Sequence, residues 1–455
     1  MGMKFLEKNF SMNSQNKEVK RKKTLGIVIL EGLTLLNFYA LFWCSMVMLI
    51  GITCVAVIQP IFLKEVIKVP QQHFGKINAN LLLLKEIAVI LFLGIAGALS
   101  DKYGRKILMT LGLLVSGLLF IVFGYADHIG RATDTNSLIW VFIMRFLYAV
   151  TLTFAWPQVF TILGDYTEHE SRGKGNAIIG IMAGIGAMLT FILISKIPEK
   201  FGILAGFYIC GGLLIFTALV SHFGIVDRLP KDISKRKKTI EILKEAMDAL
   251  KISPGLKLSY AASFISRATV GILGTFMMTW VVKVASDSNM DSHKATAVGG
   301  MVIGISAMAG LVTAPFWGIL SDKWGRMPAL TLSLFLTGLG FVLMGFVVNP
   351  FSGLTKLCII FCGIGQIGLM IVSTTLAIDL SPPKVLGSVL GGFNTLGALG
   401  IFVIGTIGGF LFDEVSYVAP FVLTGAVSFV VLLWAILVYN KVPKITGKSS
   451  GVSAH

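Results

Sequence analysis

The chain has 455 residues, of which 55% are hydrophobic and 14% are charged, and its formal net charge is +16. Soluble domains carry about 25% charged residues, so this composition excludes an ordinary globular enzyme and indicates a chain whose solvent is mostly lipid. A strongly basic chain could bind nucleic acid, but the long aliphatic runs would make a nucleic-acid-binding protein insoluble. We therefore expect a lipid bilayer, and no nucleic acid, around this protein.

The chain begins with a polar, basic tail, residues 1–36, which we expect on the cytoplasmic side. Seven of the first 23 residues are Lys or Arg, and no small-residue cleavage site follows a short apolar core. No cleavable signal peptide is therefore predicted. Residues 25–36, which include Glu31, are a candidate for a helix that lies along the membrane interface.

Twelve apolar runs follow, each close to the ~20 residues that a membrane-spanning helix needs. The predicted spans are 37–62, 79–100, 107–126, 138–163, 174–195 and 203–224, then 258–284, 296–320, 329–348, 354–379, 385–411 and 417–440. The first six-helix half covers residues 37–225, and a hydrophilic linker, 226–257, follows it. The second half covers residues 258–440 and is followed by a C-terminal tail, 441–455. We predict an all-α integral membrane protein with twelve transmembrane helices.

The Lys and Arg residues indicate which side of the membrane each loop occupies. If the N-terminus is cytoplasmic, the cytoplasmic tails and loops hold 27 of the 39 Lys and Arg residues, and the opposite loops hold 9. The remaining three lie within spans. Because basic residues concentrate in cytoplasmic loops, this bias predicts that both termini are cytoplasmic.

A ten-residue loop occurs twice, between spans 2 and 3 and between spans 8 and 9. Residues 97–106 read GALSDKYGRK and residues 318–327 read GILSDKWGRM, so seven positions match at an offset of 221 residues. A second feature recurs in the same order, because Asp165 after span 4 corresponds to Asp379 after span 10. The two features predict parallel six-helix repeats related by an axis along the membrane normal.

The repeated loop resembles the signature of the major facilitator superfamily, G-x-L-[SA]-D-[RK]-x-G-R-[RK]. The first copy matches this signature throughout, and the second departs from it only at Met327. The similarity covers residues 37–440 and implies a secondary transporter with two six-helix halves around a central site. In this superfamily spans 1, 4, 7 and 10 line the cavity. The signature does not name a substrate.

The resemblance also implies that the first loop is part of a cytoplasmic gate. Asp101 would dock against the start of span 11, where the helix dipole is positive, and Arg105 would bridge to Asp165. The alternative is that the loop is only a topology signal. A topology signal needs no aspartate and no fixed glycines, so we favour the gate.

The second loop would mirror the first, with Asp322 against the start of span 5 and Arg326 near Asp379. The gate residues expected from the two repeats are Gly97, Asp101, Gly104, Arg105, Lys106, Asp165, Gly318, Asp322, Gly325, Arg326 and Asp379.

Four charged residues, Lys85, Glu86, Arg145 and Arg267, lie deep inside the predicted spans and not near their ends, and charges there are costly and by default functional. Glu86 and Arg145 lie at similar depths, so they pair, bind a proton and an anion alternately, or form a purely structural ion pair. Lys85 lies about 100° around the helix from Glu86, so the two side chains are expected to point different ways, with Lys85 free to reach outward. Arg145 and Arg267 would face the cavity from opposite halves and would suit an anionic substrate.

Further polar and aromatic residues at mid-depth are candidates for the substrate pocket, with packing as the alternative for each. They are Gln59, Trp156, Gln158, Trp280, Gln366 and Asn394. Pairs of glycines with GxxxG spacing, which allow close helix packing, indicate an interface between the halves or only the usual glycine enrichment of membrane helices. These pairs are Gly180 and Gly184, Gly300 and Gly304, Gly387 and Gly391, and Gly405 and Gly409.

The sequence contains no nucleotide-binding P-loop, no metal-ligand cluster and no nucleophile–base pair, so it predicts neither an enzyme nor a cofactor. We interpret the chain as a secondary transporter that moves a small solute, anionic in one hypothesis, by alternating access. Symport with protons would use Glu86 as the protonation site.

One alternative function is a drug or metabolite efflux antiporter. Span 5 has Gly184-Ile185-Gly186 where the drug exporters of the superfamily have a Gly-Pro pair, which counts against it. A second alternative is a transport-inactive membrane sensor or scaffold. The one N-x-S/T site, at Asn9, lies in the cytoplasmic tail, so we expect a bacterial inner membrane and a monomeric protein.

Overall fold

The computed structural model describes residues 23–24, 27–28, 30, 32–167, 169–227, 253–287, 291–381 and 386–444. Within this part of the chain, twelve helices are long and apolar enough to cross a membrane, which confirms the predicted fold class. The first six are α2 (Leu35–Glu65), α3 (Phe74–Tyr103), α4 (Arg105–Phe123), α6 (Ser137–Tyr166), α7 (His169–Ile192) and α9 (Ile203–Gly224). The second six are α11 (Pro254–Asp287), α12 (Ser292–Trp324), α13 (Arg326–Leu343), α14 (Gly353–Asp379), α15 (Leu386–Glu414) and α16 (Ala419–Val438).

Short elements connect or extend these helices. They are β1 (Lys23–Thr24), β2 (Ile27–Val28), η1 (Gln71–His73), α5 (Ala126–Ala132), η2 (Ile194–Lys196), α8 (Ile197–Phe201), η3 (Met344–Phe346) and η5 (Tyr439–Lys441). The sequence indicates an interfacial helix over residues 25–36, but the described residues there pair β2 with β1 before α2 begins. β-branched side chains such as Ile27 and Val28 favour that extended backbone. Most of the linker, 226–257, lies outside the described residues.

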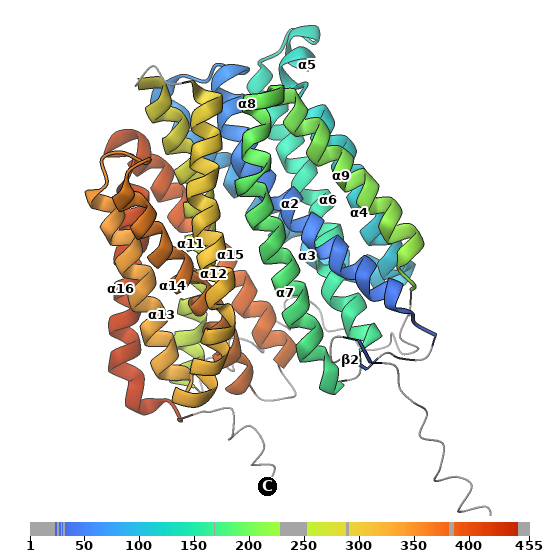
Figure 1. Cartoon of the computed structure of the whole chain (residues 1–455), viewed down its shortest axis with the longest axis vertical. Coiled ribbons are helices and arrows are strands. Elements are labelled where there is room, and N and C mark those ends of the chain that lie inside the picture. The colour runs from blue at the N-terminus through green and yellow to red at the C-terminus, as the bar shows by residue number, and fades with distance from the viewer. Residues whose placement is uncertain are drawn as a thin grey trace, which may run out of the picture.

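The helices form two bundles of six, α2 to α9 and α11 to α16, which lie side by side in Figure 1. The repeat is visible in the backbone of the two matching loops. Gly104, between α3 and α4, has φ 105°, and Gly325, between α12 and α13, has φ 107°. Both values lie in the left-handed region that favours glycine, so this glycine is required in both loops.

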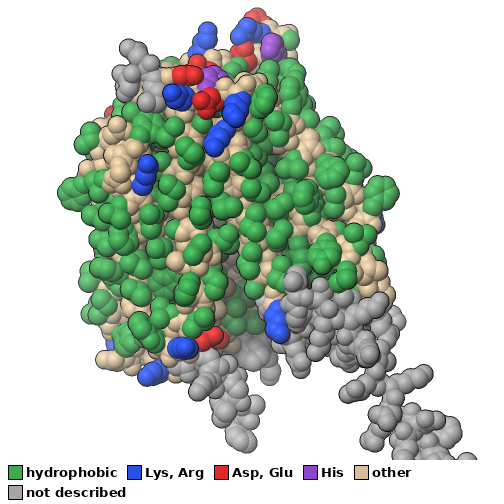
Figure 2. Space-filling view, viewed as in Figure 1, with side chains coloured by type: hydrophobic (Ala, Val, Ile, Leu, Met, Phe, Trp, Pro, Cys, Tyr) green, Lys and Arg blue, Asp and Glu red, His purple; other side chains and the backbone are tan. Residues whose placement is uncertain are grey.

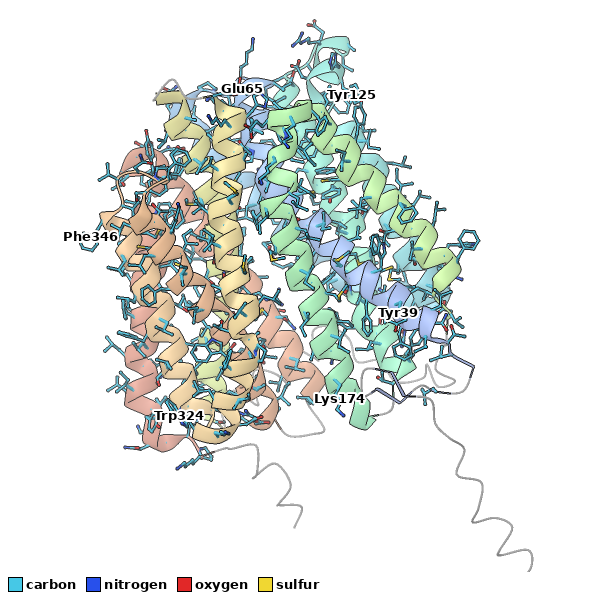
Figure 3. All side chains as sticks on the ribbon, viewed as in Figure 1. Tyr39, Glu65, Tyr125, Lys174, Trp324 and Phe346 are labelled. Carbon is cyan, nitrogen blue, oxygen red and sulfur yellow. The ribbon has the colours of Figure 1, made fainter. Side chains whose placement is uncertain are left out.

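We call the end of the molecule with the two repeated loops the motif face and the opposite end the far face. Figure 3 labels Lys174 and Trp324 toward the motif face, and Glu65 and Tyr125 toward the far face. Hydrophobic side chains cover the surface between the two faces in Figure 2, while many charged side chains gather near the ends. This distribution is the one expected for a protein whose middle contacts lipid tails.

The most buried spans are α2 and α11. In an apolar stretch of 18 residues, 67% of the α2 residues and 78% of the α11 residues are buried. These helices are equivalent in the two repeats, and they contact one another across the bundles. They are therefore the central pair of helices where the two bundles meet.

Candidate functional site

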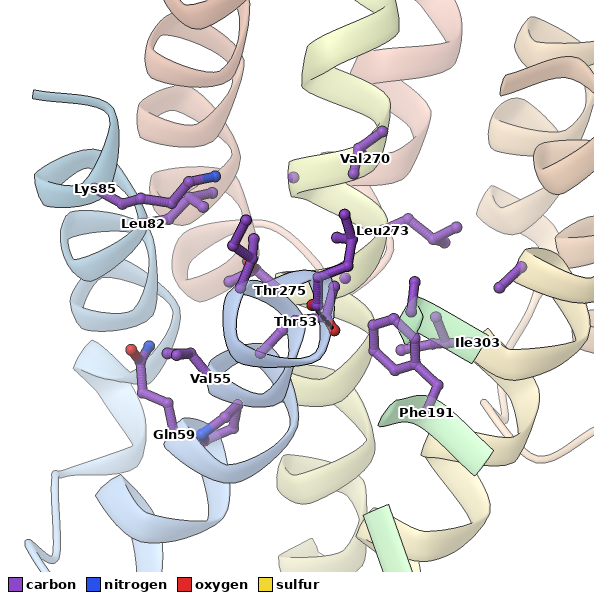
Figure 4. A pocket seen from close by; sticks show the side chains of 18 of the residues that line it. Thr53, Val55, Gln59, Leu82, Lys85, Phe191, Val270, Leu273, Thr275 and Ile303 are labelled. Carbon is purple, nitrogen blue, oxygen red and sulfur yellow. Dashed lines mark hydrogen bonds between the residues drawn. The ribbon is translucent and has the colours of Figure 1, made fainter. Parts of the chain in front are cut away.

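A cavity of about 230 Å³ lies between the two bundles, and Figure 4 shows it from close by. The first bundle contributes lining residues from α2, α3, α6 and α7, and the second contributes them from α11, α12 and α14. Spans 1, 4, 7 and 10 are thus among the lining helices, together with spans 2, 5 and 8.

Two cationic side chains line the cavity, Lys85 on α3 and Arg145 on α6. The Nζ atom of Lys85 lies 2.8 Å from Oε1 of Glu86, whose residue is only 4% exposed. The sequence predicts that these neighbours point in different directions. In the structure the long lysine side chain nevertheless reaches its neighbour, which offsets part of the cost of burying the carboxylate. In Figure 4, Lys85 extends from α3 toward α11.

Arg145 is 5% exposed, and its guanidinium makes no ion pair or hydrogen bond with any residue in the described part of the chain. Glu86 therefore contacts Lys85 and not Arg145, unlike the pair that the sequence suggests. Burying a charge without a partner is unfavourable, and unused guanidinium donors are well suited to bind an anion.

Arg267 on α11 contacts another candidate residue. Its Nη2 donates to Oδ1 of Asn394 on α15 at 2.7 Å, and both residues are exposed. Neither lines the central cavity. Arg267 therefore belongs to the contact between α11 and α15, whereas Lys85 and Arg145 are the cationic residues at the cavity.

Two of the predicted glutamines line the cavity. The amide of Gln59 donates to Asn78 Oδ1 at 3.1 Å, and its own buried Oε1 has no partner among the described residues. Gln366 donates to Thr269 Oγ1 at 3.2 Å. Four further polar residues line the cavity and are not among the residues predicted from the sequence. They are Thr53, Asn78, Thr275 and Ser306.

Three further candidates lie outside the cavity lining and pack against their surroundings. Trp156 meets Phe160 edge to face at 5.4 Å between ring centres, and Trp280 lies 6.2 Å from the Phe421 ring. Gln158 donates to a carbonyl of its own helix at 3.2 Å. Mid-depth position alone does not reveal the direction in which a side chain points, so the sequence grouped these residues with the lining ones.

Two lysines cross between the bundles at the far face, in equivalent positions of the two repeats. Lys64 of α2 donates to Ser292 Oγ at the start of α12 at 2.5 Å. Lys283 of α11 donates to the Gln71 carbonyl, just before α3, at 3.0 Å. The ammonium of Lys283 also lies 4.8 Å from the ring centre of Tyr417. At the far face, each bundle therefore donates one lysine hydrogen bond to the other bundle.

Asp413, near the end of α15, strengthens the same closure by capping the start of α3. Its Oδ1 and Oδ2 accept from the backbone N–H groups of Gly75 and Lys76, both at 2.8 Å. The Lys76 ammonium pairs with Glu414 at 2.6 Å. Anionic groups are stabilised at helix N-termini, where backbone donors are free. Asp413 could not be predicted as a site residue, because a carboxylate at the end of a span has no local signature in the sequence.

At the motif face, Arg105 meets Asp165 of α6 in an ion pair, and its Nη2 lies 3.7 Å from Asp101. Its backbone N–H donates to Asp227 Oδ1 at 3.2 Å, another contact that the sequence did not suggest. Gly97 accepts from a hydroxyl within its own helix, and Lys106 is partly exposed. Asp101 is expected to dock against the start of span 11, and residues 382–385, which lead into α15, lie outside the described part of the chain.

The second loop has the equivalent arrangement. Arg326 Nε lies 2.7 Å from Asp379 Oδ2, and Nη1 lies 2.6 Å from Asp322 Oδ1. The Asp322 side chain is 56% exposed, whereas that of Asp379 is 17% exposed. The sequence predicts that Asp322 faces the start of span 5, and this stays a prediction because the side chains of residues 169–173, in the first turns of α7, lie outside the described part of the chain.

The two bundles are close at the far face and less close at the motif face along α7 and α12. A Cβ atom on Gly300 would lie 2.2 Å from Ser195, and one on Gly304 would lie 2.6 Å from Ile192. Toward the motif face, a Cβ on Gly180 or Gly318 would meet nothing within 4 Å. Figure 1 shows the same divergence of α7 and α12 toward the lower end. The cavity is therefore closed on the far face.

The family follows from a comparison of the sequence with family models. The model of the Major Facilitator Superfamily matches residues 41–403 and, in a second match, residues 258–454. The chain belongs to the Major Facilitator Superfamily. It is accordingly a multi-pass membrane transporter and not an enzyme, as the repeated loop predicts.

The relatives of this chain include proteins named for different roles, a magnetosome protein and a multidrug resistance protein. The chain is 29% identical over 400 residues to the magnetosome protein MamH of Paramagnetospirillum magneticum, covering 87% of this chain and 91% of MamH. It is 24% identical over 260 residues to the multidrug resistance protein MdtG of Yersinia enterocolitica, covering 56% of this chain and 57% of MdtG.

A solved structure supports the fold of this superfamily member. The nucleoside transporter NupG superimposes with a TM-score of 0.67 at 13% identity. The match covers 89% of this chain and 99% of the NupG chain. At this identity the similarity concerns the fold alone.

Proposed function

We propose that this transporter moves a small anionic solute together with a proton by alternating access. The observation that carries the proposal is the charge arrangement at the centre. Glu86 is paired with Lys85 at 2.8 Å, while Arg145 lines the same cavity without a partner among the described residues. Two cationic groups in the cavity lining, with one carboxylate beside them, favour an anion as cargo.

Glu86 supplies the coupling in this proposal. With Glu86 ionised, Lys85 is occupied by its carboxylate. Protonation of Glu86 releases Lys85, which then binds the anion together with Arg145. The proton and the anion therefore favour each other's binding, which is the requirement for symport.

The gates of the proposed cycle lie at the two ends of the molecule. We assign the motif face to the cytoplasm, because basic residues concentrate there. The structure then corresponds to an inward-facing state, and the repeated loops with Asp101 and Asp322 would close the cytoplasmic side in the outward-facing state. We place the protein in a bacterial plasma membrane, as a monomer with both termini inside.

An efflux antiporter for drugs is the second candidate, and the similarity to MdtG favours it. The cavity of about 230 Å³ is smaller than the ~300–1,000 Å³ of pockets for drug-sized ligands. Its charged lining residues are cationic, which disfavours the cationic compounds that many exporters carry. We therefore rank anion symport first.

The test is uptake by proteoliposomes that contain the full chain, with and without an inward proton gradient. Radiolabelled anionic, neutral and cationic solutes are compared, and empty liposomes give the background. Anion uptake that depends on the gradient supports symport. Gradient-driven movement of cationic drugs alone would favour the antiporter, and no flux of any class would favour a sensor.

A further inference from the structure

The cavity is polarised between the two bundles. Both charged side chains of its lining, Lys85 and Arg145, come from the first bundle. The nine lining residues of the second bundle are all uncharged: three are polar, Thr275, Ser306 and Gln366, and Val270, Leu273 and Ile303 are large and apolar. Phe191 of α7 lies beside Ile303 in Figure 4 and extends this apolar wall.

A polarised cavity matches a ligand with one charged end and one apolar end. The cationic wall offers the Lys85 ammonium and the free guanidinium donors of Arg145, which can hold both oxygens of a carboxylate. The apolar side chains opposite, Val270, Leu273 and Ile303, gain free energy from burying the apolar surface of a ligand. Sulfate or phosphate would leave these three side chains without a partner.

The net charge of Lys85, Glu86 and Arg145 indicates how many negative charges the ligand carries. With Glu86 ionised, the group of Lys85, Glu86 and Arg145 has a net charge of about +1. Protonation of Glu86 raises this charge to about +2, and one bound monoanion returns it to about +1. The empty and the loaded forms then have the same charge, so moving either across the bilayer meets the same electrostatic cost. A dianion would break this balance.

We infer that the substrate is a small organic monocarboxylate, whose carboxylate replaces that of Glu86 on Lys85 and whose apolar body packs on Phe191, Leu273 and Ile303. This inference rests on the proposed function and narrows its substrate class. One proton enters with each anion, and the proton remains on Glu86 while the anion is bound.

Binding to the purified full-length protein in detergent tests the inference. Calorimetry measures the affinities of butanoate, pentanoate and hexanoate, with succinate, phosphate and sulfate as comparison anions. A pH indicator in weak buffer measures protons taken up per bound anion. We expect affinity to rise about fourfold with each methylene and one proton to be taken up per anion.

Two matched variants separate a built apolar wall from general partitioning into detergent. Phe191→Ala removes a ring from the wall and should flatten the rise with chain length. Phe160→Ala removes an exposed ring outside the cavity lining and should leave the rise unchanged.

Tighter binding of succinate, phosphate or sulfate than of hexanoate would overturn the inference and leave anion symport standing. An equal rise in both variants, or no dependence on chain length, would also overturn it. No anion binding, or binding without proton uptake, would overturn the proposed function itself.

Discussion

The carboxylate of Asp413 caps the first turn of helix α3 through the backbone N–H of Gly75, at 2.8 Å. The two residues are 338 positions apart and belong to different bundles. The superfamily signature implies a similar contact at the other end of the same two helices, where Asp101 of α3 would dock on the start of α15. Spans 2 and 11 would thus be joined at each end by a carboxylate that caps a helix. In this structure the contact at the far face, between Asp413 and the start of α3, is formed.

Asp413→Asn should open the far face. Loss of a charged helix cap costs about 0.5–2 kcal/mol, which corresponds to a twofold to thirtyfold shift in the equilibrium between the two states. A cysteine at Ala56, which lines the cavity, on a background without native cysteines reports the change. An impermeant maleimide added from the far-face side should react faster in this variant.

Glu414→Gln is the matched control for that measurement. The Glu414 side chain is 50% exposed in its pair with Lys76, and exposed pairs contribute little. Its labelling rate should stay close to that of the parent. Equal acceleration in both variants would show that general loss of negative charge, and not the helix cap, opens the face.

Gly300→Ala should also shift the protein away from this state. The added Cβ would lie 2.2 Å from Ser195 and 2.4 Å from a backbone carbonyl of α7, so the two helices must separate. Gly212→Ala places the same methyl group on α9, outside the gate, where nothing lies within 4 Å. Only Gly300→Ala should raise labelling of the Ala56 cysteine from the far face. No change in that variant would contradict the close packing described for α7 and α12.

The two partners of Arg326 should differ in their contribution to stability. Asp379→Asn removes a mostly buried charged contact and should cost about 1.5–3 kcal/mol. Asp322→Asn removes a contact whose aspartate is 56% exposed and should cost less than about 1 kcal/mol. Thermal unfolding in detergent compares the two variants, and the opposite ranking would argue against the burial described for the pair.

Hydrophobic runs predict the twelve spans because the bilayer sets both their length and their composition. Many helices extend past those runs by up to five residues, as at the start of α3, where Phe74 precedes the predicted residue 79, whereas α13 ends at Leu343, five residues before the predicted residue 348. Polar residues such as Lys76 continue a helix once water or headgroups are available. The repeated loops also indicate the proximity of Arg326 and Asp379, since equivalent loops of a repeat share their partners.

The cavity lining could not be predicted in the same way, because it depends on how each helix is rotated and which state is populated. Trp280 and Gln366 were equal candidates by depth, yet Gln366 lines the cavity and Trp280 packs in the core. Lys85 was expected to point away from Glu86, but a flexible four-carbon chain overrides the direction of its Cβ. Asp413 accepts hydrogen bonds from backbone N–H groups, and because every residue except proline has such a group, the sequence does not reveal this contact.

Glu86→Gln tests whether Glu86 couples a proton to the anion, because this variant removes the protonation site and keeps the size of the side chain. The amide resembles the protonated carboxyl group, so Lys85 stays available and the loaded carrier can exchange anions across the membrane. The empty carrier, which needs the Glu86–Lys85 pair, should return poorly. In proteoliposomes we predict that anion counterflow persists while net uptake driven by a pH gradient is lost. Net uptake that still follows the pH gradient in Glu86→Gln would contradict the account.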